Sequence, residues 1–433
     1  MQNANKNRLV IEPGAMARIY LSVSVVIITA AAFLGAAGAW TGSAFLNTVH
    51  PYVFFTGFGN LAILILNRYL ISVICPELEV DPEKQMRYLY GVLLSLFLVV
   101  LAVYMNWPLL KALVGLFLII IVSVAAKEIF SELFVGRLWR EVSARYYIFD
   151  VIFLLVANLG LFTLGLKEAF PETGIIPFFV TQSSYFLGSS FPLSISVMGF
   201  LYTYVWRRSS KAKLIKQLFS IWFYVFVSGV LVFLIAILMG NYIGMMLVSH
   251  TLMFGVIVLL IGFARYLHRF FSTQFRHPAL AFLLSGLAML FAASAYGILN
   301  IYFFKSFGAV PPIPEERMWI YHSHTHAALL GWITFSFTGM IYIVVPAIVK
   351  SNSLELLRSE KALSQLLDEM TLSRAFGQLT IAFVSATSVL LAFYLKSNSL
   401  MAFAGVVFGF AVYYSRVNLG KAFRGLSEQA AQK

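Results

Sequence analysis

Charged residues and cysteines are both scarce in this chain. Asp, Glu, Lys and Arg make up only 11% of the 433 residues, whereas a soluble domain carries about 25%. The chain therefore has too little charge to cover a water-facing surface, which excludes an ordinary soluble fold. The single cysteine, Cys75, excludes an intrachain disulfide, a two-cysteine copper site and a four-cysteine iron–sulfur cluster. The first apolar run also lacks the short core and cleavage pattern of a secretion signal.

Hydrophobic residues account for 60% of the chain and form long apolar runs. A membrane-crossing helix needs about 20 mostly apolar residues, and only helices or closed barrels satisfy the backbone inside a bilayer. The sequence predicts an all-α polytopic protein, a single integral membrane domain over residues 1–433 with about twelve transmembrane helices. The expected spans are 17–39, 45–74, 87–106, 108–135, 146–166, 176–206, 215–239, 241–266, 279–303, 318–346, 373–395 and 400–418.

Basic residues alternate sharply between the loops on the two sides. Of the 31 Lys and Arg, one side carries only Lys111, Lys167, Lys305, Arg317 and Lys396, and Lys127 lies inside the fourth span. Cytoplasmic loops are the ones enriched in basic residues, so both termini are expected to be cytoplasmic. The net charge of +13 then faces the cytoplasmic leaflet, and no nucleic-acid partner is needed to explain it. The longest cytoplasmic segment, 347–372 between spans ten and eleven, fits either a short amphipathic helix or a linker.

The seven histidines fall into two groups. His268 and His277 follow span eight among arginines and are interpreted as ordinary interfacial residues. The others lie near the starts of even-numbered spans, in the outer third of the expected membrane: His50, His250, His322, His324 and His326. Polar residues inside spans are costly and usually functional. Five imidazoles at one depth on three helices therefore predict cofactor ligands.

The spacing within YHSHTHAALLGW sets the directions of three of these rings. At 100° per residue, His322 and His326 share one helix face, whereas His324 points about 200° away. Two hemes flanking the helix would use these opposed directions. A zinc ion, whose ligands converge on one point, could instead use His322 and His326 with His250. The heme interpretation is preferred, and the zinc interpretation is left open.

Two segments resemble the catalytic subunit (subunit I) of heme–copper oxidases, closest to the C-type (cbb-type) oxidases and the nitric oxide reductases. The segment from His324 to Trp332, with the aromatic run to Pro346, is similar to the tenth helix of that family. His50-Pro-Tyr-Val-Phe-Phe-Thr-Gly-Phe-Gly-Asn60 is similar to the helix with the other low-spin heme ligand. The resemblance implies that His50 and His326 hold a low-spin b-type heme and that His324 holds a second, high-spin heme as the catalytic group. His50 and His324 also each precede a glycine by seven residues, which indicates a weak internal repeat.

The copper ligands of that family have no counterpart here. The resemblance places Ser189 and Ser190 where the sixth-helix histidine is expected, and Leu231 and Val232 where the seventh-helix pair is expected. Copper is therefore expected to be absent, unless His250 and His322 form a relocated second metal site.

The function implied is an oxidoreductase or electron-transfer subunit that handles O2 or NO at a heme. It would sit in a bacterial or archaeal cytoplasmic membrane, with a partner subunit or a cytochrome or quinol as electron donor. One alternative is a nitric oxide-response heme protein of the NnrS kind, and another is a twelve-span transporter. Transporter sites usually lie near the midplane, whereas these histidines are expected near one face.

Three acidic residues lie toward the expected cytoplasmic side. Glu128 and Glu132 share a face at the end of span four, and Asp150 opens span five. They could begin a proton-entry route, but the preferred interpretation is interfacial residues that reach water or pair with Lys127 and Arg145.

Overall fold

The computed structural model describes residues 13–74, 81–132, 138–173, 188–206, 212–271, 277–303, 315–351 and 367–431. Within these ranges every regular element is a helix, and eleven helical stretches are long and apolar enough to cross a membrane. The prediction of an all-α polytopic membrane protein is confirmed. The long unbroken helices are α1 (Pro13–Thr41), α4 (Pro82–Tyr104), α5 (Pro108–Glu132), α6 (Val142–Ala169), α8 (Gly188–Trp206), α9 (Ala212–Leu238), α10 (Tyr242–Phe271), α11 (Pro278–Phe303), α15 (Glu369–Tyr394) and α16 (Asn398–Ala431).

Two further spans are broken into shorter pieces. One consists of α2 (Ala44–Tyr52), the π-helices η1 (Val53–Gly59) and η2 (Ala62–Leu66), and α3 (Asn67–Ile74). The other consists of α12 (Met318–His326), the π-helix η7 (Ala327–Ile333) and α13 (Thr334–Ser351). Short 3₁₀ turns are η3 (Leu138–Arg140), η4 (Pro171–Thr173) and η6 (Glu315–Arg317).

The two broken spans form the centre of the bundle. Along their most apolar windows 89% of residues in Ala44–Ile71 and 83% in Met318–Ala347 are buried, against 11 to 50% in the other nine spans. The central spans also carry many of the buried polar side chains, among them Asn60, Asn67 and Thr334. Polar side chains are costly against lipid, so the polar residues of these two spans favour burial at the centre of the bundle.

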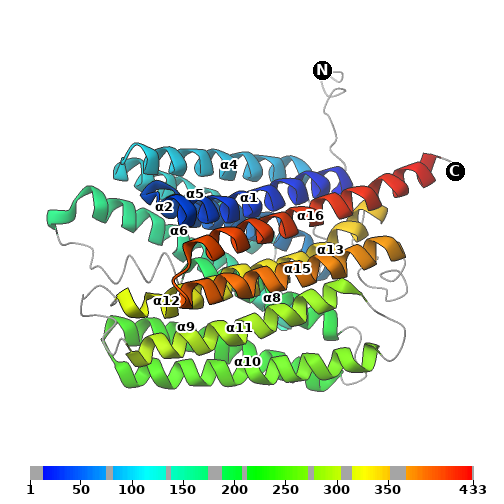
Figure 1. Cartoon of the computed structure of the whole chain (residues 1–433). Helices are drawn as coiled ribbons and strands as arrows, with labels where there is room; N and C mark the ends of the chain where they lie inside the picture. Colours follow the sequence, from blue (N-terminus) through cyan, green and yellow to red (C-terminus); the bar gives the residue numbers. More distant parts are fainter. Residues whose placement is uncertain are drawn as a thin grey trace.

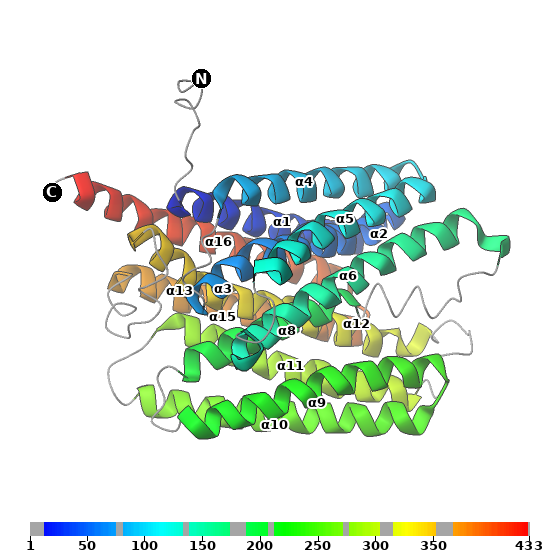
Figure 2. The same ribbon diagram turned by 180° about the vertical axis from the view of Figure 1, so that it is seen from behind.

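The long unbroken helices pack around this centre in nearly the order of the chain. α4 packs on α5, α5 on α6, α6 on α8, α9 on α10, and α10 on α11, while α16 packs on both α1 and α15. Figures 1 and 2 show the start of α1 and the end of α16 at one end of the bundle, with α2 and α12 at the opposite end. The start of α1 and the end of α16 therefore share a side, as an even number of crossings requires, and α2 and α12 begin on the other side.

Tight turns join four consecutive helix pairs at the end where α2 and α12 begin. Each turn contains one residue with positive φ: Gly42, Asn106, Gly240 and Lys396. At three of them the next N–H bonds back five residues, as Trp107 N does to Ala102 O at 2.8 Å. This is the usual way to satisfy carbonyls at a helix C-terminus.

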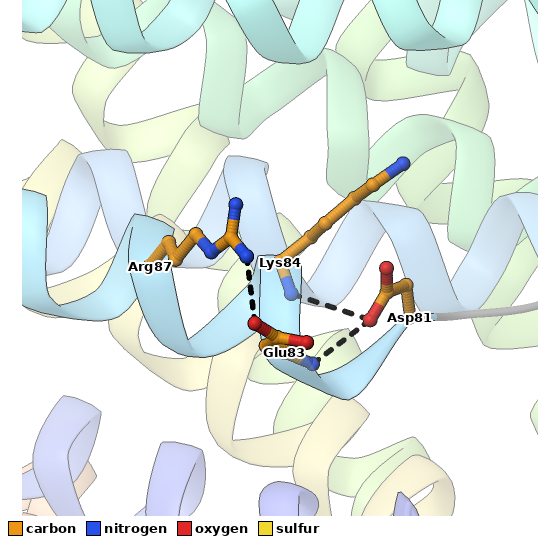
Figure 3. Close-up of polar contacts among 4 residues, drawn as sticks. All are labelled: Asp81, Glu83, Lys84 and Arg87. Atoms are coloured by element: carbon orange, nitrogen blue, oxygen red, sulfur yellow. Dashed lines mark hydrogen bonds and ion pairs between the residues drawn. The ribbon is translucent and has the colours of Figure 1, made fainter. Parts of the chain in front are cut away.

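The opposite end of the bundle shows a well-defined helix start at α4. Asp81 accepts hydrogen bonds from the backbone N–H groups of Glu83 and Lys84, and Glu83 pairs with Arg87 one turn later at 2.6 Å (Figure 3). With Pro82 at the first helical position, the segment has both a side-chain cap and a preset φ. The helix thus starts five residues before the expected span at residue 87.

The π-helical segments repeat with the same register in both central spans. η1 starts three residues after His50 and η7 three residues after His324, and each is seven residues long. Asn60 follows η1 and donates to Phe55 O at 3.3 Å, and Thr334 follows η7 and donates to Leu329 O at 2.7 Å. Both side chains therefore bond a carbonyl five residues back. The repeat seen in the sequence corresponds to a repeated local structure, and π-turns often mark functional sites.

Two expected segments are only partly covered. The sixth expected span, 176–206, is described from Gly188 onward as α8, whose apolar part is shorter than a full crossing. In the expected cytoplasmic segment 347–372, α13 extends to Ser351 and α15 begins at Glu369. Residues 352–366 lie outside the described residues.

Candidate functional site

His50 on α2 and His326 on α12 face each other from the two central spans. Their ring centroids are 6.5 Å apart and their planes differ by 32°. Both side chains are half-buried. The two residues are 276 positions apart in the sequence, and the fold brings them together at the end of the bundle where both spans begin.

Each of these rings is anchored through the same nitrogen. Nδ1 of His50 lies 3.3 Å from Leu46 O, and Nδ1 of His326 lies 2.8 Å from His322 O. With the Nδ1–H donated to a carbonyl, Nε2 carries the free lone pair that a metal requires. The anchoring carbonyl is in each case one helical turn earlier, so the α-helical stretch before each π-segment sets the ring orientation.

Small and aromatic neighbours shape the space around the pair. A Cβ added to Gly35 on α1 would lie 3.3 Å from Cδ2 and 3.7 Å from Nε2 of His50. Glycine at this position therefore avoids a tight contact with the edge of His50 that carries Nε2. On the other side, Phe393 of α15 packs against His326 with centroids 4.6 Å apart and stacks on His322 at 5.0 Å.

His324 points away from this pair, as the helical spacing predicts. Its Nδ1 lies 2.8 Å from Ala293 O on α11, and a Cβ added to Gly297 of the same helix would lie 3.0 Å from its Cε1. His324 thus faces α11, whereas His322 and His326 share the face toward α15. His324 also has its Nδ1 engaged, so its Nε2 is the nitrogen left for a ligand.

His250 lies apart from the other four. Its side chain is exposed on α10, and its Nδ1 lies 2.7 Å from Met246 O of its own helix. None of the ring contacts among the described residues joins His250 to another histidine. In the described part of the chain no three His, Cys, Asp or Glu residues are grouped so that they could hold one metal ion.

The His50–His326 geometry fits a heme with two axial imidazoles. Two imidazole nitrogens, each about 2 Å from one metal and on opposite sides of it, bring the ring centroids to about 6 Å. The observed 6.5 Å agrees with this value. His322 and His326 have a similar separation, 6.2 Å, but they occupy successive turns of one helix and cannot lie on opposite faces of a planar macrocycle.

The positions that would carry the copper ligands do not face this site. Leu231 and Val232 are both 48% exposed on α9, which packs mainly against α8 and α10. Trp222, on the same helix, is buried against α10, because a Cβ at Gly255 would lie within 2.6 Å of two of its ring atoms. The side chains of Ser189 and Ser190 lie outside the described residues.

The acidic residues at the other end of the bundle differ from the expectation in their partners. Glu128 forms an ion pair with Lys84 of α4 at 3.5 Å. Asp150 is fully buried, because α6 begins at Val142 and places it about two turns inside the helix. The interpretation of Asp150 as an interfacial residue is therefore wrong. Arg145 instead donates to Ser220 and to Trp139 O, and the side chain of Glu132 lies outside the described residues.

Several site residues could not be found from the sequence. Gly35, Gly297 and Phe393 touch the histidines, yet each is an ordinary residue in an apolar run, and nothing in its own helix marks it. Asn60 is marked in the sequence only by the resemblance of the His50–Asn60 segment to the oxidase helix. The sequence also holds a second signal for Asn60. Asn60 follows His50 at the same spacing at which Thr334 follows His324, so a polar side chain recurs at this position of the repeat.

No family model matches the chain, and no curated protein sequence is significantly similar to it.

Proposed function

We propose that this chain is a heme-binding integral membrane protein in which His50 and His326 hold one b-type heme between them. The observation that carries the proposal is the pair of Nδ1-anchored imidazoles, 6.5 Å apart, contributed by the two central spans. A six-coordinate heme of this kind supplies one-electron transfer. Gly35 avoids a tight contact with the edge of His50 that carries Nε2, and Phe393 packs against the ring of His326.

His324 is proposed to hold a second heme on the opposite side of α12. Its Nδ1 contact with Ala293 O orients the ring and leaves Nε2 for iron. With one protein ligand, such a heme has an open face that binds a diatomic gas, O2 or NO. His324 is then the catalytic residue, and the chain acts as an oxidoreductase or electron-transfer subunit resembling oxidase subunit I.

The absence of a histidine pair on α9 supports a site that works without copper. Leu231 and Val232 offer no ligand atoms, and both point outward. The proposal includes a partner subunit or a cytochrome or quinol as electron donor, and a bacterial or archaeal cytoplasmic membrane as the location.

The visible spectrum of the purified protein tests the proposal. His50→Ala and His326→Ala are each expected to abolish the sharp reduced bands of a low-spin heme. His250→Ala is the matched control, because His250 has the same Nδ1 contact one turn back but lies exposed on α10. The control is expected to keep the full spectrum.

Other outcomes would overturn the proposal. A colourless protein that also fails to bind added heme would favour the transporter interpretation. A full low-spin spectrum in His50→Ala would show that the two central spans do not share a heme.

A further inference from the structure

A second polar cluster lies deep in the bundle, away from the histidines. It consists of Asp150 on α6, Asn67 on α3 and Ser196 on α8, all buried. The carboxylate oxygen Oδ2 of Asp150 accepts a hydrogen bond from Ser196 Oγ at 2.8 Å and another from Asn67 Nδ2. Asn67 Nδ2 also lies 3.1 Å from Ser196 Oγ. Two helices, α3 and α8, thus each place a donor on one oxygen of a carboxyl group carried by a third helix, α6.

The remaining oxygens of the cluster are acceptors without donors. Oδ1 of Asp150 and Oδ1 of Asn67 are both buried, and neither has a hydrogen-bond partner among the described residues. Buried polar atoms are nearly always paired, so two such acceptors in one cluster call for an explanation. The amide nitrogen of Asn67 already donates to Oδ2 of Asp150. The two unpartnered atoms are therefore the amide oxygen of Asn67 and the second carboxyl oxygen of Asp150.

One proton on the carboxyl group resolves both deficits. A protonated carboxyl has an O–H donor as well as an acceptor oxygen. With the proton on Oδ1, Asp150 would donate to Asn67 Oδ1 while Asn67 Nδ2 donates to Asp150 Oδ2, which is a cyclic acid–amide pair. No bond to carbon or change of oxidation state is involved.

The ion pairs of the described residues also favour a protonated Asp150. None of the ion pairs among the described residues includes Asp150. An ionised carboxylate in a membrane interior without a cationic partner is strongly disfavoured. The titratable or cationic residues on the same helices are Arg68 and Tyr69 on α3, Arg145, Tyr146, Tyr147, Lys167 and Glu168 on α6, and Tyr202 and Tyr204 on α8.

Two of these residues donate hydrogen bonds to groups outside the cluster. Arg145 donates to Ser220, and Tyr146 donates to Phe219 O at 2.7 Å. Tyr202 packs its ring against Phe219. We propose that Asp150, Asn67 and Ser196 form a membrane-buried proton-binding site, in which Asp150 holds one proton at neutral pH.

Infrared spectroscopy of the full chain at pH 8 tests this site directly. Exposed carboxyl groups titrate near pH 4 and are ionised at pH 8, so a protonated carboxyl C=O band reports a buried acid. Among the described residues Asp150 is the only fully buried acidic side chain. We expect one such band in the unmodified protein and its loss in Asp150→Asn.

Two further variants separate the site from a general effect of mutation. Asp81→Asn is the matched control, because Asp81 is exposed and asparagine caps a helix as well as aspartate; it should keep the band. Ser196→Ala should move the band to higher frequency, because the C=O oxygen loses one of its two donors. Asp150→Asn should also unfold at no lower temperature than the unmodified protein, since its amide supplies the same donor and acceptor pattern.

Three results would overturn the inference. The first is the absence of a protonated carboxyl band at pH 8, which would mean that a cation such as Arg68 neutralises Asp150. The second is loss of the band when sodium chloride replaces choline chloride, which would make the cluster a metal-cation site. The third is a band that survives in Asp150→Asn. The histidines take part in none of these measurements, so the result is independent of the heme proposal.

Discussion

Substitutions of increasing size at Gly35 test the proposed His50–His326 heme site, because their contact with His50 can be worked out from the structure. An alanine Cβ at this position would lie 3.3 Å from Cδ2 and 3.5 Å from Cγ of the His50 ring. That approach is closer than ordinary van der Waals contact, so the imidazole must move by a few tenths of an ångström away from α1. The change affects the edge of the ring that carries Nε2, the proposed iron ligand.

The expected cost is moderate for alanine and larger for valine. Overpacking a well-filled site costs about 1–3 kcal/mol, and each 1.4 kcal/mol is a tenfold change in affinity. Gly35→Ala should therefore weaken heme binding by roughly tenfold, and Gly35→Val by more. The helix itself should not be destabilised, since alanine is favoured over glycine inside a helix by roughly 0.5–1 kcal/mol.

The assay is heme titration of the heme-free protein, followed by the low-spin absorption bands, with thermal unfolding measured in parallel. Gly262→Ala is the control, because nothing lies within 4 Å of a Cβ added there. It should leave both heme affinity and the spectrum unchanged. Equal heme affinity and an identical spectrum in Gly35→Val would refute the placement of the heme beside His50.

Three other predictions follow from the topology, the missing copper ligands and the packing of the central spans. Cysteines placed at Lys213 and Lys167 in a cysteine-free background should label from the cytoplasmic and outer sides respectively, and labelling from a single side would contradict the span count. Elemental analysis should find heme without stoichiometric copper, and carbon monoxide binding should disappear in His324→Ala; one copper per chain that is lost in His322→Ala would contradict this. Gly331→Ala should destabilise the protein by about 1–3 kcal/mol in thermal or denaturant unfolding, because the new Cβ would lie 2.4 Å from a side chain of α11. Unchanged stability would show that this contact can relax.

The spans themselves were readily predicted from the sequence, because a continuous apolar run determines a membrane helix largely by its length. Expected spans 108–135 and 279–303 agree with α5 and α11 to within a few residues. Which spans lie at the centre was not evident from hydropathy. Mean hydropathy is 1.5 for Ala44–Ile71 and also 1.5 for Asn398–Gly420, yet 89% of the first window and 44% of the second are buried.

The sequence singled out the histidines of the candidate site but not their surroundings. Histidines are rare in membrane spans, so His50, His324 and His326 could be singled out one by one. Their partners could not, because Gly35 and Phe393 act through packing between helices that are distant in sequence. Asp150 was misjudged for a related reason: the sequence placed the start of the helix four residues too late, which moved a buried carboxyl group to the surface.

Electron paramagnetic resonance of the oxidised protein tests the central claim most directly, because it reports both the ligation of a ferric heme and the relative orientation of its axial rings. Nearly parallel imidazole planes split the iron d-orbitals strongly and give a rhombic low-spin signal, whereas perpendicular planes give a highly anisotropic signal with one large g value. The 32° angle between the His50 and His326 rings predicts the rhombic signal. This signal should be retained in His250→Ala and lost in His50→Ala. The absence of any low-spin ferric signal, or a signal typical of perpendicular rings, would contradict the proposed pairing of His50 with His326.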